Sequence, residues 1–277
     1  MSSPLAVITG ASSGIGAASA RGLGRDGWRV VLVARTRSKL EKVAEEIEAA
    51  RGQAVVEAVD AADGPQVIAM AERVRRQHGA PRLIVNSAGA GRWLFIEETS
   101  PDEVQEMMEA PFLAAFNVCH AFMADMLEAR SGTIIHVGSP ASRIPWPGAT
   151  GYTSSRWALR GLQESLCQDL RGTGVKSCHV VFGEVSSPYF DNNPGVRDSM
   201  PKLGKLIPVL SPERCAEIIA RTARRPRRQV VAPTMLRLMY WTAAIAPGPV
   251  RWLIALSLIH ISEPTRQPAT SRMPSSA

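Results

Sequence analysis

The sequence contains few residues that would indicate a metal centre or a disulfide framework. Its four cysteines, Cys119, Cys167, Cys178 and Cys215, form no Cys-x-x-Cys pair. This spacing excludes the common zinc-ligand patterns and favours buried thiols in a reducing compartment. The five histidines are scattered, and His136 lies within an apolar, strand-like run, which favours a structural role. We therefore predict no metal site.

Targeting signals and nucleic-acid motifs are also missing. The first residues lead directly into an apolar run with no secretory leader before it, and no internal repeat follows. The net charge of +7 gives a general attraction to anions, but no nucleic-acid-binding motif accompanies it. We therefore expect a cytoplasmic protein without a nucleic-acid partner. Its length suits one α/β domain.

A glycine-rich turn stands between the first predicted strand, Leu5–Ile8, and the first predicted helix, Ala17–Arg25. The turn reads Thr9-Gly10-Ala11-Ser12-Ser13-Gly14-Ile15-Gly16. Glycines let the backbone approach a pyrophosphate, and the helix N-terminus offers unpaired N–H groups to that anion. The turn therefore points to a bound dinucleotide.

The glycine spacing is G-x-x-x-G-x-G and differs from the commoner G-x-G-x-x-G fingerprint. Taken alone, three such glycines fit an ordinary tight turn equally well. The context favours the dinucleotide, because a second apolar strand at 30–33 and a polar helix at 38–50 complete the βαβ unit.

Two later motifs complete a recognisable combination. One is Asn86-Ser87-Ala88-Gly89, and the other is Ser139 with Tyr152 thirteen residues further on. From about Leu5 to about Pro233 the chain resembles the short-chain dehydrogenases/reductases. The resemblance implies an α/β fold: a single doubly wound Rossmann domain with a parallel sheet.

The strand pattern agrees with this fold independently. Apolar runs typical of buried strands recur along the chain, separated by helical segments. After the first two they lie at Ala54–Val59, Leu83–Asn86, Thr133–Val137, Val175–Val181 and Gln229–Ala232.

The cofactor is inferred from the residue after the second strand. An acidic residue there would favour NAD, whereas an arginine favours the 2′-phosphate of NADP. Arg35 stands at this point, followed by Arg37 and Lys39, so NADP(H) is preferred and NAD(H) is the second possibility. The alternative is that both arginines are ordinary surface charges.

The resemblance implies further residues around the dinucleotide. Asp60 matches the family's residue at the adenine amino group. Three residues of the second motif match the turn beneath the cofactor, namely Asn86, Ala88 and Gly89. With the glycine-turn residues Gly10, Ser12, Ser13, Gly14, Ile15 and Gly16, they form the predicted binding set.

The resemblance also implies the catalytic groups. Tyr152 is the acid/base, and Ser139 orients the substrate oxygen. The family has a lysine four residues after the tyrosine, on the same helix face, where this chain has Arg156. An arginine can hold the nicotinamide ribose and favour the phenolate, but it cannot relay a proton because it is effectively never deprotonated.

A second departure affects the proton relay. The family's relay asparagine falls on Pro111 in this sequence. Asn117 lies six residues later, on the opposite side of an ideal helix, so we interpret it as a locally satisfied polar residue. Two interpretations follow. The chain is an enzyme with a modified relay, or it is a catalytically impaired dinucleotide-binding scaffold or regulatory protein.

The segment after the sixth strand resembles the family's turn over the carboxamide. Val185 would meet the carboxamide through its backbone, and Ser187 would stand in for a threonine. By resemblance Pro188–Pro208 is the substrate lid, where glycine and proline suit a gating loop. Ser211 and Pro212 are typical of a helix start.

An apolar run at 235–255 follows the basic cluster Arg224–Arg228. Arg237, Arg251 and Pro247-Gly248-Pro249 interrupt this run, which argues against a transmembrane helix. We favour packing on the substrate site or on a partner subunit. The alternative is peripheral membrane contact, with Trp241 and Trp252 at an anionic interface.

The final segment resembles a translated sequencing-library adapter. Leu256–Arg266 matches one part of such an adapter, and Ser271–Ala277 matches its continuation. We therefore divide the chain into a Rossmann domain (1–233), an apolar extension (234–255) and a non-native tail (256–277), and we expect the native C-terminus to be missing.

The sequence thus predicts an NADP(H)-dependent oxidoreductase that interconverts a carbonyl and an alcohol. Its small-molecule substrate is small or hydrophobic. By resemblance alone we expect a homo-oligomer that pairs through the tyrosine-bearing helices.

Overall fold

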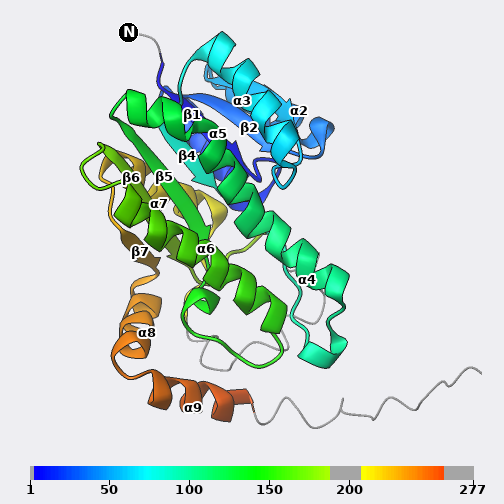
Figure 1. The fold of residues 1–277 in the computed structure, drawn as a ribbon, viewed down its shortest axis with the longest axis vertical. Helices are drawn as coiled ribbons and strands as arrows, with labels where there is room; N and C mark the ends of the chain where they lie inside the picture. Colours follow the sequence, from blue (N-terminus) through cyan, green and yellow to red (C-terminus); the bar gives the residue numbers. More distant parts are fainter. Residues whose placement is uncertain (1–2, 188–206, 259–277) are drawn as a thin grey trace, which may run out of the picture.

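A seven-stranded parallel sheet forms the middle layer of the molecule (Figure 1). The computed structural model describes residues 3–187 and 207–258. The strand order is β3-β2-β1-β4-β5-β6-β7. The bounds are β1 (Leu5–Thr9), β2 (Arg29–Ala34), β3 (Gln53–Ala58), β4 (Leu83–Asn86), β5 (Gly132–Gly138), β6 (Val175–Phe182) and β7 (Gln229–Ala232). Every predicted strand is present, and the predicted Rossmann fold is confirmed.

The central strands are apolar on both faces. All residues of β1 and β4 are buried, and Val7 pairs with Val31 of β2 on one side and Ile84 of β4 on the other. A parallel strand with helices on both faces has no exposed side, so a continuous apolar run suits it better than alternation. This explains why short apolar runs identify the strands.

Helices cover both faces of the sheet (Figure 1). One face packs against α1 (Gly14–Arg25), α2 (Arg37–Ala49) and α7 (Pro212–Arg224). The other face packs against α3 (Gly64–His78), α5 (Ala114–Glu128) and the end of α6 (Thr150–Asp169). Each fully buried leucine or isoleucine in these layers contributes roughly 1.5–3 kcal/mol through removal of apolar surface from water.

A π-helical turn joins α4 (Pro101–Met108) to α5. This turn, η2 (Glu109–Leu113), contains the buried Pro111. Proline has no N–H for the α-helical ladder, and a π-type turn accommodates that gap. The whole segment Pro101–Glu128 is long and apolar enough to cross a membrane by length and composition alone. Its residues Phe122 and Met126 have no exposed surface and pack in the core, as in a core helix of a globular protein.

The apolar extension forms two helices after β7. They are α8 (Thr234–Ile245) and α9 (Pro247–Leu258), with the break at the predicted Pro-Gly-Pro interruption. The first residues of the adapter-like segment belong to α9, and 259–277 lie outside the described residues. The predicted lid also lies outside them, apart from Ile207 and Pro208.

Two histidines lie side by side in the middle of the sheet. His136 of β5 and His179 of β6 are register partners, and neither has exposed surface. Burial disfavours the charged imidazolium, and it lowers the pKa of both side chains to about 3. The predicted structural role of His136 agrees with this position.

Acidification should therefore destabilise the fold between about pH 6.5 and pH 3. An unfolded histidine binds a proton near pH 6.5, whereas both folded side chains stay neutral until about pH 3. In this window the unfolded state binds more protons, so the free energy of unfolding falls by up to roughly 1.4 kcal/mol per pH unit for each histidine. Urea unfolding at pH 7, 6 and 5 measures this slope.

In the variant His179→Gln the free energy of unfolding should depend less steeply on pH than in the wild type, whatever the absolute stability of the variant. The exposed His120 provides the matched control, since His120→Gln leaves the buried pair intact. Identical slopes in the wild type and His179→Gln would contradict the assignment.

Candidate active site

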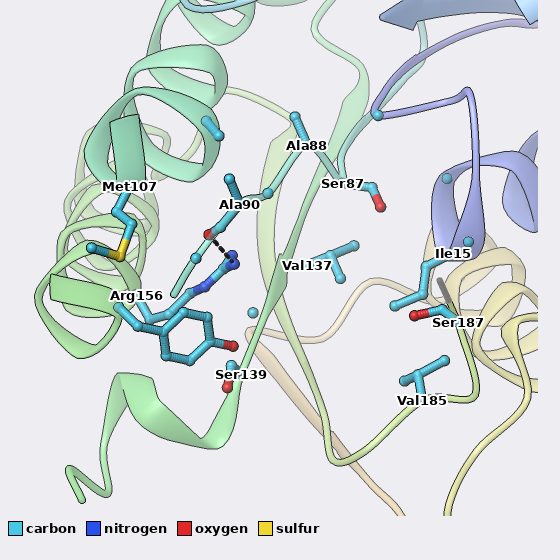
Figure 2. Close-up of a pocket in the computed structure, with 18 of the residues that line it drawn as sticks. Ile15, Ser87, Ala88, Ala90, Met107, Val137, Ser139, Arg156, Val185 and Ser187 are labelled. Carbon is cyan, nitrogen blue, oxygen red and sulfur yellow. Dashed lines mark hydrogen bonds between the residues drawn. The ribbon is translucent and has the colours of Figure 1, made fainter. Parts of the chain in front are cut away.

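A cavity of about 980 Å³ opens at the carboxyl edge of the sheet. The turns after β1, β4, β5 and β6 line it (Figure 2). In a doubly wound sheet the carboxyl edge is where ligands bind, at the point where the strand order reverses. Here the chain turns back between β1 and β4, and the cavity lies over that crevice.

The glycine turn approaches the turn after β4 very closely. Gly10 has φ +65°, and a Cβ at this residue would lie 2.8 Å from the Ser87 carbonyl oxygen. Thr9 Oγ1 accepts hydrogen bonds from the backbone N–H groups of Ser87 and Ala88, each at 3.1 Å. A side chain at Gly16 would overlap the Gly10 carbonyl. Only glycine fits at these two positions.

The N-terminus of α1 adjoins the cavity. Its N-cap Ser13 makes no side-chain capping bond, and Ser12, Ser13, Gly14 and Ile15 all line the cavity. The first N–H groups of a helix have no partner within the helix and carry the positive end of its dipole. The position therefore suits an anionic group such as a pyrophosphate.

The loop after β6 closes over the glycine turn. Val185 forms a bridge with Leu210, and Ser186 N donates to the Leu210 carbonyl at 2.9 Å. A Cβ at Gly14 would lie 3.5 Å from Ser187 Cβ. Figure 2 shows Ile15, Val185 and Ser187 beside one another at this side of the cavity.

Basic residues border the cavity next to the end of β2. Arg35 and Lys39 are exposed and line it. Arg37 differs, because it forms an ion pair with Glu41 at 3.8 Å and is not among the lining residues. Asp60 also lines the cavity, and its Oδ1 accepts a hydrogen bond from Ala62 N at 3.0 Å.

Asn86 is the one predicted site residue that does not line the cavity. It is buried beneath the floor, where its Nδ2 lies 3.3 Å from His136 Nδ1 and 3.5 Å from Cys119 Sγ. Burial of Cys119 raises the pKa of its thiol to about 12, so the thiol beside Asn86 is neutral. Asn86 supports the turn that carries Ala88 and Gly89, which do line the cavity.

Ser139, Tyr152 and Arg156 line the same cavity. Ser139 follows β5, and the other two lie one turn apart on α6, each 7% exposed. The Arg156 Cζ atom lies 4.8 Å from the centroid of the Tyr152 ring. Figure 2 shows Ser139 and Arg156 pointing into the cavity.

The guanidinium of Arg156 reaches from α6 to the turn after β4. Its Nη2 donates to the Ala90 carbonyl at 3.2 Å, and a Cβ at Gly89 would lie 3.0 Å from the same nitrogen. Its Nε is buried and has no hydrogen-bond partner within the part of the chain that the structure describes. A buried N–H without a partner is costly, so this group is available to a ligand in the cavity.

The sequence places Pro111 where the resembled family has its relay asparagine. Pro111 is buried and does not line the cavity. Asn117 Nδ2 donates to the carbonyls of Ala61 and Ala62, at 3.1 Å and 2.9 Å. Asn117 is thus satisfied locally, as predicted, and it holds α5 against the loop after β3.

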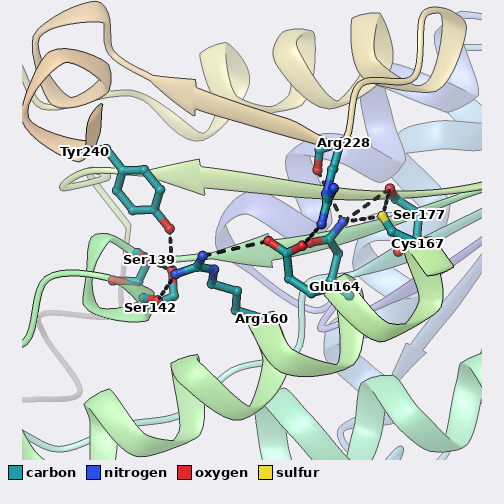
Figure 3. Close-up of polar contacts among 9 residues, drawn as sticks. Ser139, Ser142, Arg160, Glu164, Cys167, Ser177, Arg228 and Tyr240 are labelled. Atoms are coloured by element: carbon teal, nitrogen blue, oxygen red, sulfur yellow. Dashed lines mark hydrogen bonds and ion pairs between the residues drawn. The ribbon is translucent and has the colours of Figure 1, made fainter. Parts of the chain in front are cut away.

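Sequence reasoning missed the residues that hold Ser139 in place. Ser142 Oγ donates to the Ser139 carbonyl at 2.7 Å and lies 3.0 Å from the Tyr240 hydroxyl (Figure 3). A serine has one hydroxyl proton, so Tyr240 is the donor to Ser142. The Arg160 Nη1 donates to the Ser142 carbonyl at 3.1 Å. These bonds fix the short helix η3 (Pro140–Ser142), whose N-cap is Ser139.

The network extends along α6 (Figure 3). Glu164 forms ion pairs with Arg160 and with Arg228, which directly precedes β7. The Cζ atom of Arg143 lies over the Tyr240 ring, 4.7 Å from its centroid. No motif in the sequence marks Tyr240. The only available signal was an isolated tyrosine within an apolar helix, where a buried hydroxyl needs a partner.

Two tryptophans flank the tyrosine. The ring centroids of Trp93 and Trp146 lie 4.9 Å apart, and they lie 6.0 Å and 6.3 Å from the centroid of Tyr152. Both indoles line the cavity. Trp93 lies in an irregular segment after β4, so no helical or strand periodicity could place it from the sequence.

Known proteins resemble the chain over most of its length. The family model described as short chain dehydrogenase matches residues 4–195 of this chain. A short chain dehydrogenase of Pseudocercospora fijiensis is 33% identical over 184 residues, 66% of this chain and 60% of the relative, so the chain spans less than two thirds of that protein. A 3-dehydrosphinganine reductase of Danio rerio is 31% identical over 229 residues, covering 78% of this chain and 67% of that protein.

A solved structure agrees with these relatives. It is a metagenomic short-chain oxidoreductase in complex with NADP, 32% identical, with a TM-score of 0.72 and coverage of 84% of this chain and 97% of that chain. The chain belongs to the short-chain dehydrogenase family. It is an NAD(P)-dependent oxidoreductase. The glycine turn, the N-terminus of α1 and the buried Arg156 fit a nicotinamide dinucleotide.

Removing the Tyr240 hydroxyl should lower the turnover number. Tyr240→Phe leaves Ser142 without its donor, and a hydrogen bond of this kind contributes about 1 kcal/mol, which corresponds to roughly five-fold in rate if it acts on the Ser139 position. The KM for the dinucleotide should not change, because Tyr240 does not line the cavity. Steady-state kinetics with any carbonyl compound that the wild type reduces will measure both constants.

The control is Thr222→Val, which removes a buried hydroxyl that donates only to Ile218 O, at 2.8 Å, within α7. Equal turnover numbers for Tyr240→Phe and Thr222→Val would show that Tyr240 has no positioning role.

Proposed function

We propose that this protein catalyses NADP(H)-dependent interconversion of a carbonyl and an alcohol on a hydrophobic substrate. One observation carries the proposal: Ser139, Tyr152 and Arg156 line the same cavity as the glycine turn. The family and the NADP complex of a structural relative support a nicotinamide cofactor. When bound, that cofactor supplies or accepts the hydride.

The three side chains have separate roles. The Ser139 hydroxyl donates a hydrogen bond to the substrate oxygen, and the Tyr152 hydroxyl gives or takes the proton on that oxygen. Arg156 takes the place of the family lysine and places a permanent positive charge beside the phenol ring.

The proton does not pass through Arg156. A guanidinium keeps its protons, and Pro111 has no side-chain donor or acceptor to support a relay water. Tyr152 therefore exchanges its proton with water that enters the cavity directly. The alternative of a catalytically impaired scaffold would combine tight dinucleotide binding with no turnover.

The NADP(H) preference rests on charge at the rim. Arg35 and Lys39 line the cavity next to the end of β2, and no carboxylate follows the strand there. A guanidinium binds a phosphate with charge-assisted hydrogen bonds that a ribose hydroxyl cannot match. Binding of NAD(H) is correspondingly weaker.

The substrate end of the cavity is apolar. Trp93, Trp146 and Met107 pack around the Tyr152 ring, and Ile144, Leu236 and Met239 extend the wall. The indole N–H groups of Trp93 and Trp146 are buried without a partner in the described part of the chain. The site thus suits an apolar carbonyl compound that also carries an acceptor oxygen.

We further propose a homo-oligomer that pairs through α5 and α6. Phe116 and Trp157 are 47% and 42% exposed on these two helices, and an apolar surface of this kind suits a subunit contact. Light scattering of the purified chain determines the oligomeric state.

Loss of the Tyr152 hydroxyl should abolish turnover while leaving dinucleotide binding intact. Tyr152→Phe is expected to reduce NADPH oxidation by at least about 100-fold over a panel of apolar aldehydes and ketones, since general acid–base catalysis contributes this much. Arg156→Met should also abolish it, whereas Arg156→Lys keeps a cation and should retain measurable turnover.

Fluorescence titration with NADPH separates binding from chemistry in each variant. Tight binding by the wild type without turnover on any carbonyl would favour the scaffold, and full activity of Tyr152→Phe would refute the catalytic assignment.

Arg35→Ala should shift the cofactor preference toward NADH. A hydrogen bond to a charged group contributes about 1.5–3 kcal/mol, so the Kd for NADPH should rise roughly 10- to 100-fold while that for NADH changes little. Arg37→Ala is the matched control, because Arg37 pairs with Glu41 away from the cavity. Equal effects of the two substitutions on NADPH would count against the role of Arg35.

A further inference from the structure

Helices α8 and α9 present a large apolar surface to solvent. We call it the outer face, and it comprises Met235, Leu238, Trp241, Ile245, Trp252 and Leu253. Leu238, Trp241 and Ile245 are 67%, 62% and 80% exposed. Their i, i+3, i+7 spacing places them on one stripe of α8. Exposed apolar side chains gathered on one stripe of a helix are typical of a binding surface.

The opposite stripe of α8 is fully packed. Leu236, Tyr240 and Ala243 are buried, and Ile254 of α9 packs against the same group. Leu236, Met239 and Ile254 also line the active-site cavity. The favoured sequence interpretation, packing on the substrate site, thus describes the inner stripe, while the outer face has another role. Both helices lie at one end of the molecule, beyond β7 (Figure 1).

The region around the outer face is strongly basic. From Ile218 to Ala255 the sequence contains seven arginines and no aspartate, glutamate or lysine. A cleft of about 760 Å³ lies between α7, β7 and α8, and we call it the arginine cleft. Its basic lining residues are Arg214, Arg221, Arg224, Arg225, Arg227 and Arg237.

Two of these arginines have acidic partners. Arg214 pairs with Glu217, and Arg224 pairs with Asp26 at 2.8 Å. Arg237 lies on α8 directly before Leu238 of the outer face, so the arginine cleft and the outer face adjoin. Basic and exposed apolar side chains therefore meet on α8.

We propose that this combined surface binds an anionic phospholipid bilayer. The apolar side chains of the outer face enter the boundary between headgroups and acyl chains, where tryptophan is favoured. The arginine cleft meets the lipid phosphates. A second copy of the chain is a poorer occupant, because a two-fold contact would place the two arginine clusters side by side. A free phosphate ion would not cover the apolar face.

Membrane contact would also affect substrate access. The inner stripe of the same two helices forms a wall of the cavity, so a bilayer-dissolved carbonyl compound would lie next to that wall. This last step rests on the proposed function, whereas the lipid contact does not depend on it.

Vesicle co-sedimentation of the full chain tests the lipid contact without any substrate. Binding is expected to vesicles that contain phosphatidylglycerol, to weaken as salt increases, and to be much lower with phosphatidylcholine alone. Arg225→Gln together with Arg227→Gln should weaken binding roughly 30-fold, since each interfacial arginine contributes about 1 kcal/mol. Trp241→Ser together with Trp252→Ser should abolish it.

Matched controls have the same chemistry elsewhere on the surface. Arg51→Gln with Arg76→Gln removes two exposed arginines, and Ile96→Ser removes an apolar side chain that is 67% exposed. Both should bind vesicles like the wild type. NADPH titration of every variant verifies that the fold is retained.

Three outcomes would overturn the proposal. The first is no binding to anionic vesicles, and the second is equal binding by the tryptophan variant and its control. The third is a stable oligomer that dissociates in the tryptophan variant and never binds vesicles, which would assign the outer face to a second copy. A wild-type protein that binds anionic vesicles but oxidises NADPH with no carbonyl compound would refute the proposed function and would leave the lipid contact unaffected.

Discussion

The close approach of two turns determines the position of everything else in the active site. Gly10 and Ser87 nearly touch, and the Thr9 hydroxyl accepts the N–H groups of both Ser87 and Ala88. These contacts lock the end of β1 to the end of β4, at the place where the sheet reverses its strand order. The cofactor cradle and the segment that Arg156 reaches are therefore parts of one rigid unit.

Arg156 packs against Gly89 across this unit. The guanidinium of Arg156 occupies the space above Gly89 and donates to Ala90, a role in which its length and planar shape matter. Arg156 therefore links α6 to the turn after β4.

The fold could be predicted from the sequence because short apolar runs between glycine turns have few alternatives in a two-faced parallel sheet. The site could be predicted where backbone motifs specify it, as for Gly10 and Tyr152. Tyr240, Trp93 and Trp146 could not be found in this way. Their roles depend on tertiary contacts between segments far apart in sequence, and the burial of Asn86 beneath the floor depends on the neighbouring strand that carries His136.

The hydrogen bond between Tyr240 and Ser142 joins residues that are 98 positions apart. The cavity likewise takes its walls from residues as distant as Gly10 and Ile254. A nascent chain emerges from the ribosome N-terminus first, and its early strands can pair before the last helices are made. The cofactor cradle can thus form during synthesis, whereas the catalytic turn is completed only after nearly the whole chain has been translated. The contact between Thr9 and the turn after β4 can thus form long before Tyr240 reaches Ser142.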